Sequence, residues 1–355
     1  MIELTYVRWK MDFDKTCALR FARELEIHDT IVLTRHERPD GDALGSVFGF
    51  RDALRAKYPG KKIISVSGDF SQKLSFLGED DEDISEDEYG KALVIVIDCG
   101  SVSQISNKHW NKGGYVVKID HHASGDDFAD LSFVFPEAAA SAEIVSEMVL
   151  DLGLGAMTKN AAALLYAGIV TDTGGFRFSV SSGTFVTASR LVSYGFDVMD
   201  LTERLFLRSR KEAELSGVLC GMIKMTPSGA AYLRLDRDVI KTFEMTREEA
   251  GDTVNLMNGI DGIPVWAVFI GEEDGTYHVR LRGRGANVRI IAEKFGGGGH
   301  DGASGAHLKT EDEIPAVIAE LDKTAKKSLD NPVSKGYNNR NVNLRRKSHI
   351  RGCNT

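Results

Sequence analysis

Carboxylate and imidazole side chains occur in four short segments, and three of these segments closely follow a run of apolar residues. The residues concerned are His36, Asp40, Asp42, Asp98, Asp120, His121, His122 and Asp172. The apolar runs before the first three segments span residues 31–34, 93–97 and 115–119. Carboxylate oxygens and imidazole nitrogens bind divalent metal ions, and metal ions acting on phosphate would make this chain a phosphoesterase.

Three of the four segments also have a structural explanation. The Pro-Asp-Gly sequence at 39–41 is typical of a surface turn, and Asp42 could cap the helix that follows. Asp98 could also be a helix cap, and Asp172 a turn residue at a helix end. Together, however, these residues offer oxygen and imidazole ligands without a thiolate cluster, which favours Mn²⁺, Mg²⁺ or Co²⁺. The number of carboxylates indicates two ions, which at about 3.5–4 Å apart can share a water and clamp a phosphoryl group.

The first half of the chain alternates helical and strand-like patterns. Helices are predicted at 14–27, 41–58, 138–152 and 159–170, and buried strands at 31–34, 63–66, 93–97 and 116–119. Continuously apolar strands are typical of parallel sheets covered on both faces. This order predicts an α/β fold with a doubly wound parallel sheet, which binds ligands at the carboxyl ends of its strands.

The second half has a different pattern. Residues 182–206 and 206–219 are compatible with helices, and strands of alternating polarity are predicted at 231–235, 265–270 and 277–281, with helices at 287–295 and 311–326. The predicted domains are a catalytic domain at 1–190, a helical linker at 191–216 and a smaller α/β substrate-binding domain at 217–329. Residues 330–355 are basic and favour a disordered tail, with a nucleic-acid-binding arm as the alternative.

Composition limits the function classes. The net charge of −8 argues against a protein that coats long nucleic acids, although metals can still create a local phosphate site. The four cysteines are far apart and the N-terminus lacks an apolar signal core, which indicates a cytoplasmic protein. The longest apolar run, 161–170, is too short to span a bilayer. The acidic block at 79–88 is predicted to be a solvated surface loop.

The motifs resemble those of a known enzyme family. His36-x-x-Pro39-Asp40-x-Asp42-x-x-Gly45-Ser46, Asp98, Asp120-His121-His122 and Asp172 are similar to the four motifs of the DHH phosphoesterases. The run 296–300, which is Gly-Gly-Gly-Gly-His, with Ala303 and Gly305, resembles the signature of the associated C-terminal domain. Within the family, the chain most resembles the nanoRNase and pAp phosphatase subgroup, in the expected motif order and up to the tail.

This resemblance implies roles for the motif residues. His36, Asp40 and Asp98 would hold one metal ion. The second ion would be held by Asp42, Asp98, His121 and Asp172, so that Asp98 bridges the two ions and is a catalytic residue. Asp120 would orient an imidazole ring, and His122 would face the substrate phosphate.

A second set of residues is predicted to bind the substrate. Gly297, Gly298, Gly299 and His300 could present N–H groups to an anion, although a flexible linker is the alternative. Arg280, Arg282 and Arg284 would share one face of a strand, where they could bind a terminal phosphate or simply be solvated. The family commonly has Arg-Ser where this chain has Arg282-Gly283, which removes one polar contact. Arg177 is a further candidate for a phosphate contact.

The predicted function is that of a two-metal phosphoesterase that uses Mn²⁺, with Mg²⁺ or Co²⁺ as alternatives. Its substrates would be short single-stranded RNA or DNA, linear dinucleotides such as pApA, and pAp, held in a cleft between the domains. The products would be nucleoside 5′-monophosphates, or AMP and phosphate. The family often dimerises, so the resemblance also predicts a homodimer, while the short apolar runs predict no membrane association. The alternatives are an inorganic pyrophosphatase or exopolyphosphatase, a cyclic-dinucleotide phosphodiesterase, and a non-catalytic nucleotide sensor.

Overall fold

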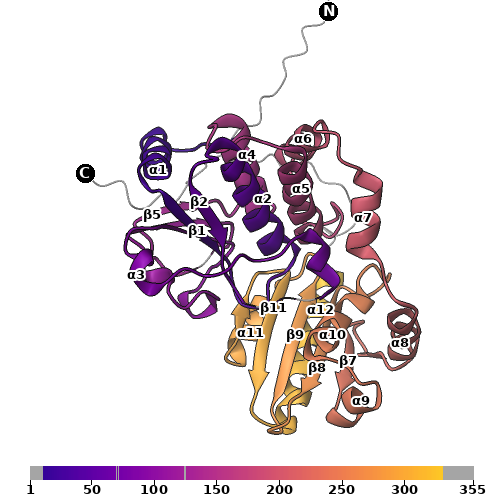
Figure 1. The fold of residues 1–355 in the computed structure, drawn as a ribbon. Coiled ribbons are helices and arrows are strands. Elements are labelled where there is room, and N and C mark those ends of the chain that lie inside the picture. The colour runs from indigo at the N-terminus through magenta and orange to yellow at the C-terminus, as the bar shows by residue number, and fades with distance from the viewer. Residues whose placement is uncertain (1–10, 69, 71, 124, 331–355) are drawn as a thin grey trace, which may run out of the picture. The chain divides into compact units, whose positions relative to one another are not determined.

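The structure is a computed structural model that describes residues 11–330 apart from residues 69, 71 and 124. The chain divides into two compact units that meet in sequence between Leu207 and Arg208 (Figure 1). The predicted basic tail lies outside the described residues, except for Asp330, which is the last residue of the helix Ile314–Asp330. Among the described residues, no helix combines the length and apolarity needed to cross a bilayer.

Unit 1 is built on a five-stranded sheet with the order β2-β1-β3-β4-β5, in which every pairing is parallel. The strands are β1 (Thr30–Thr34), β2 (Lys62–Ser65), β3 (Leu93–Ile97), β4 (Tyr115–Asp120) and β5 (Leu131–Val134). The predicted parallel α/β sheet is therefore confirmed. The sequence patterns did not predict β5, a short edge strand that contains Ser132.

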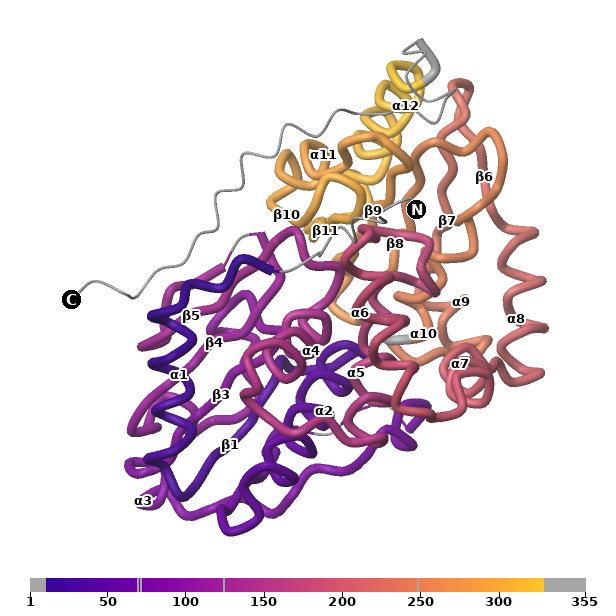
Figure 2. The backbone as a smooth tube through the Cα atoms, turned by 90° about the horizontal axis from the view of Figure 1, so that it is seen from above, coloured from indigo at the N-terminus to yellow at the C-terminus, as the bar shows by residue number. Residues whose placement is uncertain are grey.

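Helices cover one face of this sheet and shorter elements cover the other. The helical face is formed by α1 (Lys15–Ile27), α2 (Gly41–Lys57), α4 (Ser141–Asp151) and α5 (Lys159–Asp172), whose apolar side chains form one core with the strands. On the opposite face, Tyr89 of α3 (Glu86–Tyr89) and Trp110 of the 3-10 turn η3 (Trp110–Lys112) pack on the alternate strand residues. Figure 2 shows α2 and α5 side by side, which matters for the site described below.

The predicted helical stretch 182–206 consists of two helices. These are α6 (Ser182–Val192) and α7 (Val198–Phe206). Gly195 adopts a φ of 75° between them, a left-handed conformation that costs glycine little. Asp197 then caps α7 by accepting hydrogen bonds from the N–H groups of Met199 and Asp200.

Unit 2 contains a six-stranded sheet with the order β10-β11-β9-β8-β7-β6. Its strands are β6 (Lys224–Met225), β7 (Ala231–Leu235), β8 (Val265–Gly271), β9 (Tyr277–Gly283), β10 (Gly298–Gly299) and β11 (Ala303–Leu308). Its helices are α8 (Arg210–Gly221), α9 (Arg237–Thr242), α10 (Arg247–Asp252), α11 (Arg289–Lys294) and α12 (Ile314–Asp330), with 3-10 turns η4 (Thr253–Met257) and η5 (Glu311–Glu313). The prediction of alternating polarity is right for β7 and β9 but wrong for β8, which is buried at every residue because apolar clusters pack on both faces.

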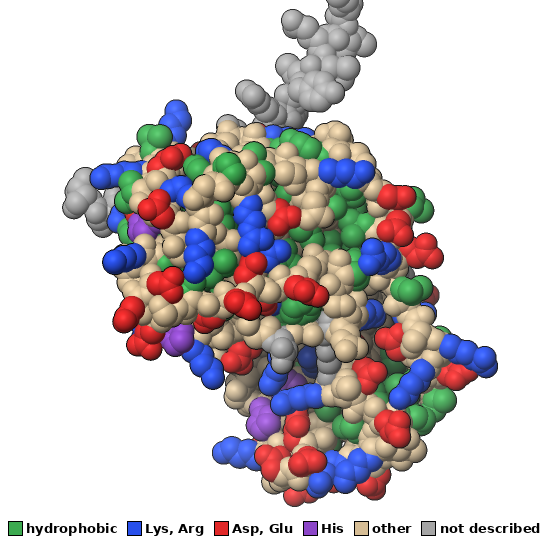
Figure 3. Space-filling model, viewed as in Figure 1, with side chains coloured by type: hydrophobic (Ala, Val, Ile, Leu, Met, Phe, Trp, Pro, Cys, Tyr) green, Lys and Arg blue, Asp and Glu red, His purple; other side chains and the backbone are tan. Residues whose placement is uncertain are grey.

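The acidic block at 79–88 is only partly a solvated loop. Asp80 binds the fully buried guanidinium of Arg35 through N–O distances of 2.9 and 2.6 Å. Asp81 binds Arg51 and Arg55 at 3.0 and 2.8 Å. The prediction is wrong at these two residues, because the buried arginines Arg35 and Arg51 need carboxylate partners. It is also wrong at residues 86–88, which are exposed but belong to the helix α3 and not to a loop. Outside the acidic block, the surface drawn in Figure 3 carries acidic and basic side chains that are interspersed with one another.

Candidate metal centre

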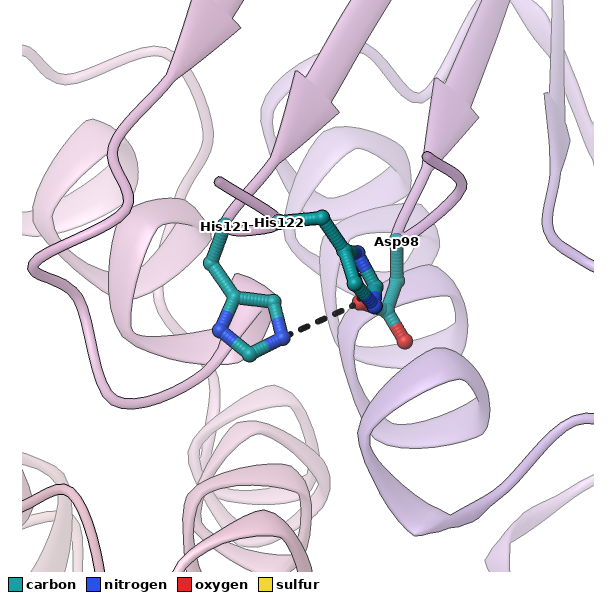
Figure 4. Close-up of side chains that lie close together, drawn as sticks. All are labelled: Asp98, His121 and His122. Carbon is teal, nitrogen blue, oxygen red and sulfur yellow. Dashed lines mark ion pairs between the residues drawn. The ribbon is translucent and has the colours of Figure 1, made fainter. Parts of the chain in front are cut away.

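The parallel sheet of unit 1 brings three of the sequence motifs to one edge. β1, β3 and β4 are neighbours, and their carboxyl ends lead directly to His36, Asp98 and the Asp120–His122 triplet. Figure 4 shows the rings of His121 and His122 beside the Asp98 carboxylate at these strand ends. The edge therefore has the ligand-binding position that is expected of an open α/β sheet.

One group of potential metal ligands consists of His36, Asp40 and Asp98, whose ligand atoms all lie within 4.8 Å of one another. The His36 Nε2 atom lies 3.5 Å from Asp98 Oδ2. Its other ring nitrogen, Nδ1, lies 2.7 Å from the carbonyl oxygen of Glu37, which can only accept a hydrogen bond. Nδ1 is therefore the donor, and Nε2 is left to face the carboxylates.

A second group consists of Asp42, His121 and Asp172, again within 4.8 Å. His121 Nε2 lies 3.6 Å from Asp172 Oδ2 and 3.6 Å from Asp98 Oδ1. Asp98, His121 and His122 form a third such group, so Asp98 is common to two of the three. Asp98, directly after β3, adopts a φ of 58°, which is uncommon for a residue other than glycine and is often found at functional sites.

Asp40 and Asp42 have different structural roles at the start of α2. Asp40 Oδ1 caps the helix by accepting N–H hydrogen bonds from Asp42 and Ala43, each 3.0 Å long. Asp42 is 1% exposed and accepts N–H hydrogen bonds from Ser141 and Ala142 at the start of α4. The capping role considered for Asp42 in its own helix thus belongs to Asp40.

Glycines allow Asp172 to approach this group. A Cβ atom on Gly41 would lie 2.4 Å from Thr171 Oγ1, and one on Gly45 would lie 2.4 Å from the Leu164 carbonyl oxygen. On the partner helix, a Cβ on Gly168 would lie 2.9 Å from Asp42 Oδ1. The close contact between α2 and α5 therefore requires these glycines, and it places the last residue of α5, Asp172, beside the start of α2.

The acidic groups shift one another's pKa values. Burial, followed by repulsion from neighbouring carboxylates, raises the pKa of Asp40 and of Asp42. Burial likewise raises the pKa of Asp172 to about 7. Burial also opposes ionisation of Asp98, but the hydrogen bond from His36 and the surrounding histidines outweigh it and lower the pKa of Asp98. Such a concentration of carboxylate oxygens, of which those of Asp42 and Asp98 are buried, is the environment that a divalent cation stabilises.

A buried chain of charges supports His122. Asp120 is fully buried, and its Oδ1 atom accepts a 2.7 Å hydrogen bond from His122 Nδ1. On the other side, Lys118 Nζ lies 3.2 Å from Asp120 Oδ2 and 3.4 Å from the Gly100 carbonyl oxygen. Lys118 was not among the sequence candidates, although a lysine inside the otherwise apolar strand 115–119 could have signalled it. Asp120 thus fixes the orientation of the His122 ring through its Nδ1 atom.

The arginines of unit 2 only partly follow the prediction. Arg280 and Arg282 are half-buried on the same face of β9, whereas Arg284 lies beyond the end of the strand and donates to the Ile260 carbonyl. Burial, followed by repulsion from Arg280, lowers the pKa of Arg282. Two guanidinium groups on one strand face, with no acid between them on that strand, form a candidate phosphate site.

The glycine run forms a hairpin. Gly298 and Gly299 form β10, which pairs with β11. A Cβ atom on Gly297 would lie 2.0 Å from the Gly305 carbonyl oxygen, and one on Gly299 would lie 2.7 Å from the Ala303 carbonyl oxygen. Backbone packing therefore explains these two glycines, while Gly298 faces open space and His300, at the hairpin turn, is exposed.

Arg177, the remaining sequence candidate, lies in unit 1 in the loop that follows α5. Its Nε atom donates a 2.7 Å hydrogen bond to the Gly174 carbonyl oxygen, and its side chain is exposed.

The sequence candidates thus fall into two sets. One set lies at the sheet edge and following loop of unit 1, and the other lies around β9 and β10 of unit 2.

Family comparisons agree with this division. Residues 30–169 match the N-terminal domain of the DHH family, and residues 230–327 match the DHHA1 domain. The chain is 36% identical to the probable bifunctional oligoribonuclease and PAP phosphatase NrnA of Streptococcus mutans, over 84% of this chain and 96% of the relative. It is also 36% identical to the bifunctional oligoribonuclease and PAP phosphatase NrnA of Bacillus subtilis, over 86% of this chain and 97% of the relative.

A solved structure shares the fold. The exopolyphosphatase-related protein of Bacteroides fragilis superposes with a TM-score of 0.81 at 23% identity, covering 91% of this chain and all of that one. At this level of identity the likeness concerns the fold alone.

Proposed function

Because this chain belongs to the DHH family, we propose that it is a metal-dependent phosphodiesterase that degrades short oligonucleotides and also converts pAp to AMP and phosphate. The observation that carries the proposal is the convergence of His36, Asp98 and Asp172, from three separate motifs, with their neighbouring ligands at one sheet edge. The names of the two NrnA relatives supply the substrate class.

The donor set fits two divalent ions. We assign His36, Asp40 and Asp98 to one ion, and Asp42, Asp98, His121 and Asp172 to the other. Mn²⁺ is our first choice, because carboxylate and imidazole ligands suit this ion. The three ligand groups contain no cysteine, whose thiolate would favour zinc. Bound ions would lower the pKa of a water molecule and neutralise charge on the phosphoryl oxygens.

The protein's own side chains complete the site. With its Nδ1 atom held by Asp120, His122 can direct Nε2 at a phosphate oxygen and stabilise the charge that develops there. Arg280 and Arg282 are assigned to a second phosphate of the substrate, and His300 to the nucleotide bound with it. A requirement for two separated phosphates favours short oligonucleotides and pAp over a single phosphomonoester.

Product analysis tests the proposal. The protein with Mn²⁺ is incubated with pAp, pApA, a pentanucleotide RNA, an RNA several times longer, and pyrophosphate. We expect monophosphates from the short substrates and no cleavage of pyrophosphate. Hydrolysis of pyrophosphate alone would overturn the proposal, and repeating the panel with Mg²⁺ and Co²⁺ tests the choice of metal.

His300→Ala tests the assignment of unit 2. Removing a hydrogen bond to a charged group costs about 1.5–3 kcal/mol, so the KM for pApA is expected to rise about 10- to 150-fold. Hydrolysis of bis-p-nitrophenyl phosphate, which has no nucleotide, is expected to be unchanged. His307→Ala is the matched control, because His307 is another exposed histidine of unit 2. Equal losses on both substrates would show that His300 only supports the hairpin.

A further inference from the structure

The loop that follows the candidate ligand Asp172 is fixed by hydrogen bonds to the next residue, Thr173. The carbonyl oxygen of Thr173, the next residue, accepts hydrogen bonds from the N–H groups of both Arg177 and Phe178, at 2.9 and 3.0 Å. The Thr173 hydroxyl accepts a third from the N–H of Phe176 at 3.0 Å. The backbones of Arg177 and Phe178 are therefore within hydrogen-bonding distance of the residue adjacent to Asp172.

Phe178 is an exposed ring at this position. It is 45% exposed, whereas Phe176 in the same loop packs against the core of unit 1 and stacks on Phe185. Behind the Phe178 ring lies Gly174, where a Cβ atom would approach the ring to 3.0 Å. Gly174 also has a φ of 57°, so a larger residue there would both strain the loop and displace the ring.

Arg177 holds the ring from one side and has donors to spare. Its guanidinium lies 5.6 Å from the centre of the Phe178 ring, and its Nε atom is fixed by the Gly174 carbonyl oxygen. Within the described part of the chain, its terminal Nη atoms have no hydrogen-bond or ion-pair partner. The loop, whose backbone is bonded to the residue after a candidate metal ligand, thus presents an aromatic face together with two guanidinium NH₂ groups, a pairing that suits a base and its phosphate.

We propose that Phe178 is a stacking surface for one nucleobase of the oligonucleotide, and that Arg177 binds the phosphate attached to that nucleotide. The proposal rests on the proposed function. Stacking on a single ring accepts every base, because each base has a π face, so this contact would select single-stranded nucleotides without selecting sequence. It would also strengthen the binding of substrates that carry a base, whereas pyrophosphate and polyphosphate have no base to stack.

The test compares Phe178→Ala with the wild type on pApA and on two abasic analogues of pApA, each lacking one base. Loss of one stacking contact is expected to lower kcat/KM for pApA about 5- to 150-fold, which corresponds to about 1–3 kcal/mol. The same substitution is expected to have no effect on the analogue that lacks the stacked base. Phe178→Tyr keeps the ring and is expected to retain wild-type values.

A binding measurement and a matched control complete the test. A dinucleotide containing 2-aminopurine is expected to lose fluorescence on binding the wild type and Phe178→Tyr, and to keep it with Phe178→Ala. Tyr194→Ala is the control, because Tyr194 is 37% exposed but lies in the turn after α6. Equal losses on pApA and both abasic analogues, or no loss on any, would overturn the stacking role. If the wild type cleaves no short oligonucleotide, the proposed function fails and the stacking proposal fails with it.

Discussion

Replacing Asp98 with Asn is expected to lower turnover of pApA at least about a thousand-fold, which corresponds to about 4 kcal/mol of transition-state stabilisation. Asp98 belongs to two of the three groups of potential ligands, and its carboxylate faces histidines from two different strand ends. The asparagine side chain has nearly the same shape but carries no charge, and only one of its terminal atoms can act as a ligand. The substitution therefore weakens both proposed ion sites at once.

Metal content and activity should be measured on the same preparations. The variant is expected to bind less Mn²⁺ at equilibrium, as well as to turn over slowly. Asp29→Asn is the matched control, because the Asp29 side chain is fully exposed. A variant with full metal content and near-wild-type turnover would show that Asp98 is not shared between two ions. Loss of folding is excluded if the thermal midpoint stays close to that of the wild type.

The positions of several site residues could be predicted because they depend on a simple rule. Parallel strands that are neighbours end at the same edge, so His36, Asp98 and His121 were expected together once three apolar runs had been recognised. The strand patterns were clear because β3 is continuously apolar. The start of α2 at Gly41 was also predicted, although the residue that caps it is Asp40 and not Asp42.

Other features depend on contacts between distant segments, which periodicity does not reveal. The approach of α5 to α2 relies on Gly45 and Gly168, but a glycine in a helical pattern signals only a weaker helix. Arg35 and Asp80 pair across 45 residues, and the sequence showed Asp80 only as part of an acidic block. Lys118 was missed because one charge in an apolar strand is usually placed on an exposed face, although its position inside such a strand was itself a signal.

The imidazole of His122 is expected to act on the substrate and not on the metal ions, and His122→Ala separates these roles. Loss of a preorganised donor to the transition state typically costs about 10²–10³ in kcat, and this is the expected loss here, with Mn²⁺ content unchanged. His122 also belongs to a group with Asp98 and His121 that could hold an ion, so metal loss in this variant would instead make it a ligand.

Asp120→Asn refines this test, because it keeps His122 but weakens the hydrogen bond that orients its ring. Loss of such a supporting contact typically costs about 10- to 100-fold, so kcat should fall less than in His122→Ala while KM changes little. The Asn side chain also leaves buried Lys118 without its carboxylate, so unfolding by urea must be measured in parallel. If Asp120→Asn were stable and fully active, the orientation of His122 would not depend on Asp120. The charge chain from Lys118 would then serve stability alone.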